Sequence, residues 1–297
     1  MRAVLTALAD ELIRLKSAGL RTVTVSEKNL TALKNAVVTR QGVARKSQPT
    51  TLNPQSAIRD PRSETRNSKL ETQNNPAIIP PPPVVTLPPG DKRTRWTGLC
   101  ERVLTDAVCR AHVRPGKKVV LGVGNLDARI FLCGEAPGAE EEQQGEPFVG
   151  PAGQLLNKMI QAMGLRREDV YIGNIMNWRP EMPTQFGNRP PTVEEMAYCL
   201  PFLRAQLEIV DAPVIVALGA TAARGLLGAD SFRSLGEIRG QWKQFAGKPV
   251  MVTYHPSYLL HNDTRRAKRA VWEDLLKVME RVGLPVSEKQ RGYFLDK

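Results

Sequence analysis

Short apolar runs alternate with longer amphipathic segments from residue 129 onward, and this alternation restricts the fold more than any other feature. The apolar runs predict strands at residues 129–134, 169–175, 213–218 and 248–254. Apolar residues at helical spacing predict helices at 152–163, 192–210, 220–227 and 264–282. Apolar strands separated by helices are typical of a parallel sheet covered on both faces. We therefore expect an α/β protein, a three-layer α/β/α sandwich around a central, mainly four-stranded parallel sheet.

The N-terminal third has a different pattern. Apolar residues at helical spacing predict a helix at 3–17 and a second short helix at 26–38, so residues 1–38 form a short helical segment. Residues 39–95 lose this periodicity and are rich in polar residues and proline, which predicts a disordered linker with a stiff polyproline end. The main domain is expected at 96–285, and a C-terminal tail at 286–297.

The positive charge lies mostly in this N-terminal third. The chain has a net charge of +12, and residues 1–95 hold 16 Lys and Arg against 7 Asp and Glu, which leaves +9 there. A basic arm on a nearly neutral body predicts attraction to a polyanion such as nucleic acid. The alternatives are a solvated tail, or a protein partner for the N-terminal helix or the Pro-rich linker.

Membrane and secretion signals are not found in the sequence. Asp10 and Glu11 interrupt the first apolar stretch, and no apolar run approaches the length of a membrane span. The four cysteines are scattered, which does not indicate a disulfide framework. We expect a cytoplasmic monomer without a membrane partner.

Polar residues follow several of the predicted strands. A loop rich in Gly, Pro and Glu follows the first, Asn174 lies near the end of the second, and His255 follows the last. Ligands of parallel sheets bind beyond the carboxyl ends of the strands, so these groups are expected to meet at one edge. The loop is not a phosphate site, because it lacks Gly-Lys-Ser/Thr and its carboxylates would repel phosphate.

These groups belong to motifs that occur in a fixed order. The chain reads GEAPG at 134–138, PFVGPAGQLL at 147–156, ALG at 217–219 and HPSYLL at 255–260, with Asn174, RP at 179–180, NRP at 188–190 and CLPFL at 199–203 between them. In this order and spacing they resemble the uracil-DNA glycosylase superfamily, nearest its type-4 branch. The resemblance covers about residues 98–280 and implies a pocket for a uracil flipped out of DNA.

The resemblance also implies roles around the base. Phe148 stacks on the uracil ring, with Ala136 beside it, and Asn174 reads the N3–H and O4 edge. Glu141 matches a position that blocks the methyl group of thymine, although a solvent-facing carboxylate is the alternative for this acidic run. A core phenylalanine is the alternative for Phe148.

The resemblance also implies that two residues take part in the cleavage of the glycosidic bond. Glu135 matches the carboxylate beside C1′ of the sugar, where it activates water or stabilises positive charge. His255 matches the histidine that stabilises O2 of uracil as the base departs. The alternative for Glu135 is a carboxylate at the entrance of a helix, and the alternative for His255 is a structural histidine. The motifs that flank both residues favour a catalytic role.

The residues that follow His255 are expected to contact DNA. Ser257 lies in this segment, and Tyr258, Leu259 and Leu260 supply a wedge for the vacated base stack or, alternatively, pack under a helix. Basic residues at the start of the next helix suit phosphates, with a solvated helix face as the alternative. They are Arg265, Arg266, Lys268 and Arg269.

The resemblance fails at the cofactor. Type-4 members carry a [4Fe–4S] cluster on four cysteines. Cys199 matches the last ligand, and Cys109 with His112 stands where the first pair is expected. Trp178 occupies the third position, and indole cannot ligate iron. We therefore expect no intact cluster, with Cys109 and Cys199 as remnants, and no other cofactor.

Together these features predict a monofunctional uracil-DNA glycosylase of base excision repair. Such an enzyme hydrolyses the N-glycosidic bond of deoxyuridine in DNA and leaves an abasic site. A catalytically weak DNA- or uracil-binding module of the same fold is the alternative. A hydrolase acting on a small molecule is disfavoured because the sequence has no G-x-S-x-G motif.

Overall fold

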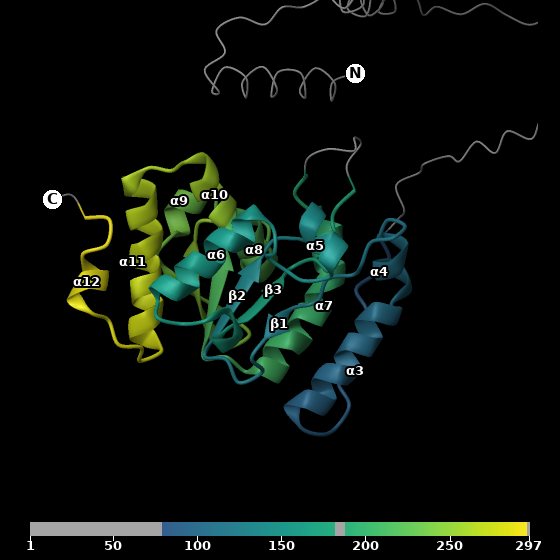
Figure 1. The fold of residues 1–297 in the computed structure, drawn as a ribbon. Helices are drawn as coiled ribbons and strands as arrows, with labels where there is room; N and C mark the ends of the chain where they lie inside the picture. The colour runs from purple at the N-terminus through teal and green to yellow at the C-terminus, as the bar shows by residue number, and fades with distance from the viewer. Residues whose placement is uncertain (1–78, 182–187, 296–297) are drawn as a thin grey trace, which may run out of the picture. The chain divides into compact units, whose positions relative to one another are not determined.

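The computed structural model describes residues 79–181 and 188–295 (Figure 1). The predicted helices at 3–17 and 26–38, and the linker from 39 to 78, lie outside these described residues. Among the described helices, none is long and apolar enough to cross a membrane.

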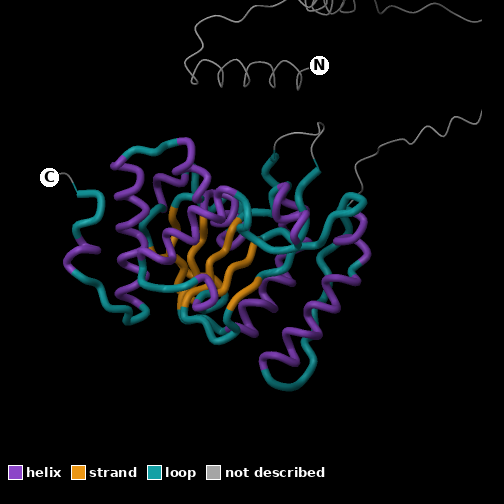
Figure 2. Tube along the Cα trace, viewed as in Figure 1, coloured by secondary structure: helices purple, strands orange, loops and turns teal. Residues whose placement is uncertain are grey.

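A six-stranded sheet forms the centre of the described part (Figure 2). Its strand order is β1-β3-β2-β4-β6-β5. The strands are β1 (Val123–Gly124), β2 (Ile130–Gly134), β3 (Tyr171–Asn174), β4 (Val214–Leu218), β5 (Trp242–Phe245) and β6 (Lys248–Thr253).

The four inner strands run parallel, as the sequence predicts. The edge strands β1 and β5 pair antiparallel with β3 and β6, so the sheet is mixed and the expected four-stranded parallel sheet describes only its centre. From β2 the chain passes to β3 on one side and then to β4 on the other. This reversal opens a crevice beyond the carboxyl ends of β2 and β4.

Helices cover both faces of the sheet (Figure 1). Phe131 and Cys133 of β2 pack into one layer, and Ile130 and Leu132 into the other. This explains why the inner strands are apolar along their whole length.

The first layer comprises α3 (Lys92–Thr105), α4 (Ala107–Ala111), α7 (Val193–Val210) and α8 (Gly219–Leu227). The second comprises α6 (Pro151–Ala162), α10 (Pro256–His261) and α11 (Arg265–Arg281). The connections hold α5 (Ala139–Gln144), the 3-10 helix η1 (Arg167–Asp169), α9 (Leu235–Ile238) and α12 (Glu288–Arg291).

The folded part begins before Trp96, where the sequence pattern places the domain boundary. Ile79, Val85 and Leu87 pack against the core. The side chain of Asp91 accepts a hydrogen bond from the Thr94 amide (2.7 Å), which caps α3 one residue before Lys92. The Pro-rich end of the expected linker is therefore packed on the domain.

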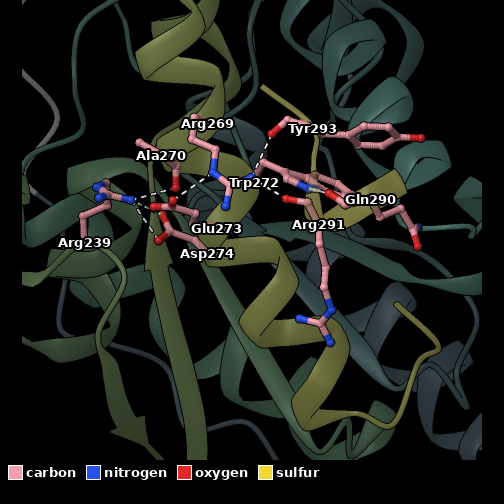
Figure 3. A network of polar contacts seen from close by, with 9 residues as sticks. All are labelled: Arg239, Arg269, Ala270, Trp272, Glu273, Asp274, Gln290, Arg291 and Tyr293. Carbon is pink, nitrogen blue, oxygen red and sulfur yellow. Dashed lines mark hydrogen bonds and ion pairs between the residues drawn. The ribbon is translucent and has the colours of Figure 1, made fainter. Parts of the chain in front are cut away.

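The C-terminal segment, expected as a tail, packs on α11 as far as it is described (Figure 3). Trp272 Nε1 donates to the carbonyl of Gln290 at 2.6 Å. Arg269 Nη1 donates to the carbonyls of Arg291 (2.7 Å) and Tyr293 (2.9 Å). Side chains of α11 thus satisfy carbonyl groups of a segment that has little regular structure of its own.

A buried carboxylate on α11, Asp274, pairs with Arg239, which directly follows α9 (Figure 3). Asp274 is 1% exposed, and its two carboxylate oxygens lie 2.8 and 2.9 Å from Arg239 Nη1. Thr253, the last residue of β6, donates its hydroxyl to the same carboxylate at 2.7 Å. This hydrogen bond fixes the end of β6, two residues before His255.

Candidate active site

A pocket of about 390 Å³ lies beyond the carboxyl ends of the parallel strands. Each of the four strands supplies a lining residue: Glu135 after β2, Asn174 at the end of β3, Thr221 after β4 and His255 after β6. The predicted meeting of polar groups at one sheet edge is therefore confirmed. The other predicted site residues that line the pocket are Ala136, Glu141, Phe148 and Ser257.

Glu135 is placed in the pocket wall by the turn after β2. Its backbone carbonyl accepts a hydrogen bond from Met176 N at 3.1 Å, which ties this turn to the one that follows β3. Burial raises the pKa of its carboxyl, and a hydrogen bond from the Thr221 hydroxyl opposes that rise. Thr221 therefore favours the carboxylate form. Sequence reasoning missed Thr221, although it lies two residues after the ALG motif.

Asn174 presents an unsatisfied acceptor. The side chain is 6% exposed, and its Oδ1 accepts no hydrogen bond within the described residues. Leaving a buried amide oxygen unpaired is unfavourable by about 1–3 kcal/mol, so the site favours a ligand with an N–H donor. Gly134 makes room for this amide, because a Cβ there would lie 2.4 Å from Asn174 Oδ1 and 2.4 Å from Phe148 Cζ.

Phe148 has an unusual backbone. Its φ is +54°, in the left-handed region, which is unfavourable for a non-glycine residue by roughly 1–2 kcal/mol. Its ring is 5% exposed and lies 5.5 Å from the His255 ring, centroid to centroid. Strained residues held in place by their surroundings cluster at functional sites.

Glu141 is buried rather than solvent-facing. Its carboxylate accepts hydrogen bonds from the amides of Val149 and Gly150 (both 2.9 Å) and of Gly138 (3.1 Å). The side chain therefore holds the loop that carries Phe148, while its own lone pairs are largely occupied. The solvent-facing alternative is wrong, since the residue is only 8% exposed.

His255 is held as one neutral tautomer. Its Nδ1 accepts a hydrogen bond from the Ser257 amide at 3.2 Å and lies 2.8 Å from Ser257 Oγ. An amide can only donate, so the ring proton is on Nε2. Burial lowers the pKa of His255 to about 4, against an opposing influence of Glu141. At neutral pH the imidazole is uncharged and offers an Nε2–H donor.

The expected wedge residues fall on different sides of α10. Leu259 is 5% exposed and belongs to the core, so its assignment to a DNA wedge is corrected. Tyr258 and Leu260 are 37% and 45% exposed. The ring of Tyr258 stacks on that of Tyr254, with ring centroids 4.2 Å apart, and this contact holds the Tyr258 side chain in position.

The four basic residues that were predicted to contact phosphates have different surroundings. The guanidinium of Arg265 donates to the carbonyl of Leu295, and Arg269 holds the C-terminal segment. Lys268 forms an ion pair with Asp263. Arg266 is exposed in the first turn of α11.

The positions of the expected cluster ligands are occupied by packed side chains. Trp178 is 1% exposed and stacks on His112, with ring centroids 5.0 Å apart and an interplanar angle of 12°. Cys109 and Cys199 are fully buried, and burial raises the pKa of both thiols. The described residues contain no group of three or more His, Cys, Asp or Glu able to hold a metal. This donor set does not fit a cluster that needs four thiolates.

Comparison with known proteins agrees with the pocket. A sequence model of the "Uracil DNA glycosylase superfamily" matches residues 121–276. A type-4 uracil-DNA glycosylase of Thermotoga maritima is 46% identical over 180 residues, which are 60% of this chain and 89% of the relative. A type-4 enzyme of Archaeoglobus fulgidus is 41% identical over 57% of this chain and 84% of the relative. A type-5 uracil-DNA glycosylase of Pyrobaculum aerophilum is 32% identical over 54% and 75%.

Proposed function

This chain belongs to the uracil-DNA glycosylase superfamily, and from that premise we infer that it is a uracil-DNA glycosylase. It hydrolyses the N-glycosidic bond of deoxyuridine in DNA, and the products are free uracil and an abasic site. The observation that carries this function is the pocket in which Glu135, Asn174 and His255 meet, each at the end of a different parallel strand.

Base recognition rests on Asn174 and Phe148. The unpaired Oδ1 of Asn174 accepts the N3–H of uracil, and its amide nitrogen donates to O4. Cytosine presents the reverse pattern at this edge and would leave buried groups unpaired. The ring of Phe148 stacks on the base, held in position by the loop that Glu141 binds.

Bond cleavage rests on Glu135 and His255. As the bond between C1′ and N1 breaks, its electron pair leaves with uracil, and negative charge collects on O2. The Nε2–H of neutral His255 donates to that oxygen. The carboxylate of Glu135 stabilises the positive charge on the sugar and orients the water that adds to C1′. The proton that this water loses balances the uracil anion, which is released as neutral uracil.

DNA contacts surround the pocket. We place Tyr258 and Leu260 in the base stack that uracil vacates, and Arg266 on a phosphate. Residues 1–95, with their charge of +9, would hold DNA near the pocket without reading bases. Docking of the predicted helix at 3–17 on a protein partner is the alternative. If the arm binds DNA, removing residues 1–78, which spares the segment packed on the domain, should flatten the dependence of affinity on salt.

We also propose that this chain works without the iron–sulfur cluster of its type-4 relatives. The stacked pair of Trp178 and His112 fills space beside Cys109 and Cys199 by packing. The steps assigned to Glu135 and His255 do not involve that region.

The experiment is single-turnover excision of uracil by Glu135→Ala and His255→Ala. Each rate should fall by about 10²-fold or more, because each change removes a positioned catalytic group. Glu101→Ala and His261→Ala are matched controls, since both residues are exposed and outside the pocket. Rates near wild type in both pocket variants would overturn the proposed mechanism.

A further inference from the structure

The two peptide groups that flank Phe148 are bound by one side chain. Arg167 Nη2 donates to the carbonyl of Pro147 at 2.6 Å, and Nη1 donates to the carbonyl of Phe148 at 3.2 Å. The directions of these two carbonyls are set by the backbone torsions of Phe148. A guanidinium that binds both carbonyls therefore favours the left-handed conformation with φ +54°.

Other groups complete this arrangement. The amide of Val149, in the same peptide group as the Phe148 carbonyl, donates to Glu141 Oε1 at 2.9 Å. Asn157 Oδ1, on α6, accepts from Arg167 Nη1 at 3.0 Å and aims the guanidinium. Gly153 allows α6 to approach, since a Cβ there would lie 1.9 Å from the Phe148 carbonyl oxygen.

We propose that Arg167 is a positioning residue for uracil excision, which acts by holding the Phe148 ring at the angle that stacks on the base. Arg167 comes from η1, outside every motif at the strand ends, and it is not among the residues that line the pocket. Its influence on the reaction must therefore pass through Phe148. This inference rests on the proposed function, in which Phe148 contacts uracil.

The test is a double-mutant cycle of Arg167→Met and Phe148→Ala, read as single-turnover uracil excision at saturating DNA. Arg167→Met should lower the rate of the otherwise unchanged protein by about 10- to 100-fold, as expected for a misplaced binding group. In the Phe148→Ala background the same change should alter the rate by less than about twofold, because the ring that Arg167 positions is gone. Arg166→Met is the matched control, since it removes the same charge from an exposed pair with Asp169 and should leave the rate unchanged.

Equal losses in both backgrounds would overturn the proposal, and so would a wild-type rate for Arg167→Met. Thermal unfolding shows whether each variant is folded. If the methionine variant is not, the same cycle with Arg167→Lys decides, because lysine keeps the charge but not the forked pair of donors. If the unaltered protein releases no uracil, the proposed function fails rather than the role of Arg167.

Discussion

Replacing Gly134 by alanine should disable the pocket without disturbing its catalytic groups directly. The new Cβ would lie 2.4 Å from both Asn174 Oδ1 and Phe148 Cζ. Unbonded atoms prefer separations of about 3.5–4.0 Å, so one or both neighbours must retreat by about 1 Å. A displacement of that size at a reacting site lowers the rate on the order of 10²-fold, or about 2.7 kcal/mol in the barrier.

The assay is single-turnover excision from a uracil-containing oligonucleotide, with thermal unfolding measured in parallel. Gly173→Ala is the matched control, because Gly173 lies in the adjacent strand β3 and its Cβ would meet its nearest neighbours at an ordinary 3.4 Å. The control should stay near the wild-type rate. A Gly134→Ala rate within about threefold of wild type, which is less than about 1 kcal/mol in the barrier, would refute the placement of Asn174 and Phe148 around the base.

Two further predictions concern protonation and iron. The pKa of His255 is about 4 in the folded protein and 6.5 when unfolded, so the unfolded chain binds the proton first as pH falls. The free energy of unfolding, measured with urea, should therefore fall as the pH is lowered from 6.5 to 4. This fall should be larger in the wild type than in His255→Asn by up to about 3 kcal/mol. Equal pH dependence in the two proteins would contradict a buried neutral imidazole. With Trp178 at a ligand position, the purified protein should lack the visible absorption of an iron–sulfur cluster, and about four irons per chain by elemental analysis would contradict this.

The centre of the fold could be predicted because its strands are buried on both faces. A run such as residues 214–218 is apolar throughout, and this marks an inner parallel strand. The edge strands give no such signal. β1 has only two residues, and β5 places Lys243 and Gln244 in a short run next to a turn at Ala246, whose φ is +47°.

The site was predictable to the extent that strand ends locate it. Asn174 is the last residue of β3 and His255 comes two residues after β6, so their meeting follows from topology. The choice between Leu259 and Leu260 depends on the rotation of a six-residue helix, which periodicity cannot fix over so short a length. Arg167 could not be found, because its effect depends on a backbone torsion at a residue distant in sequence.

The most direct test of the account is release of free base from matched oligonucleotides that differ at one position, uracil, thymine or cytosine. The pocket predicts release of uracil alone. Asn174 pairs with the N3–H and O4 of uracil, and cytosine presents the reverse pattern at that edge. Thymine shares this edge, and we expect its 5-methyl group to be excluded by Glu141, which lines the pocket. No release of uracil, or equal release from thymine or cytosine, would contradict the assignment of this pocket to uracil excision.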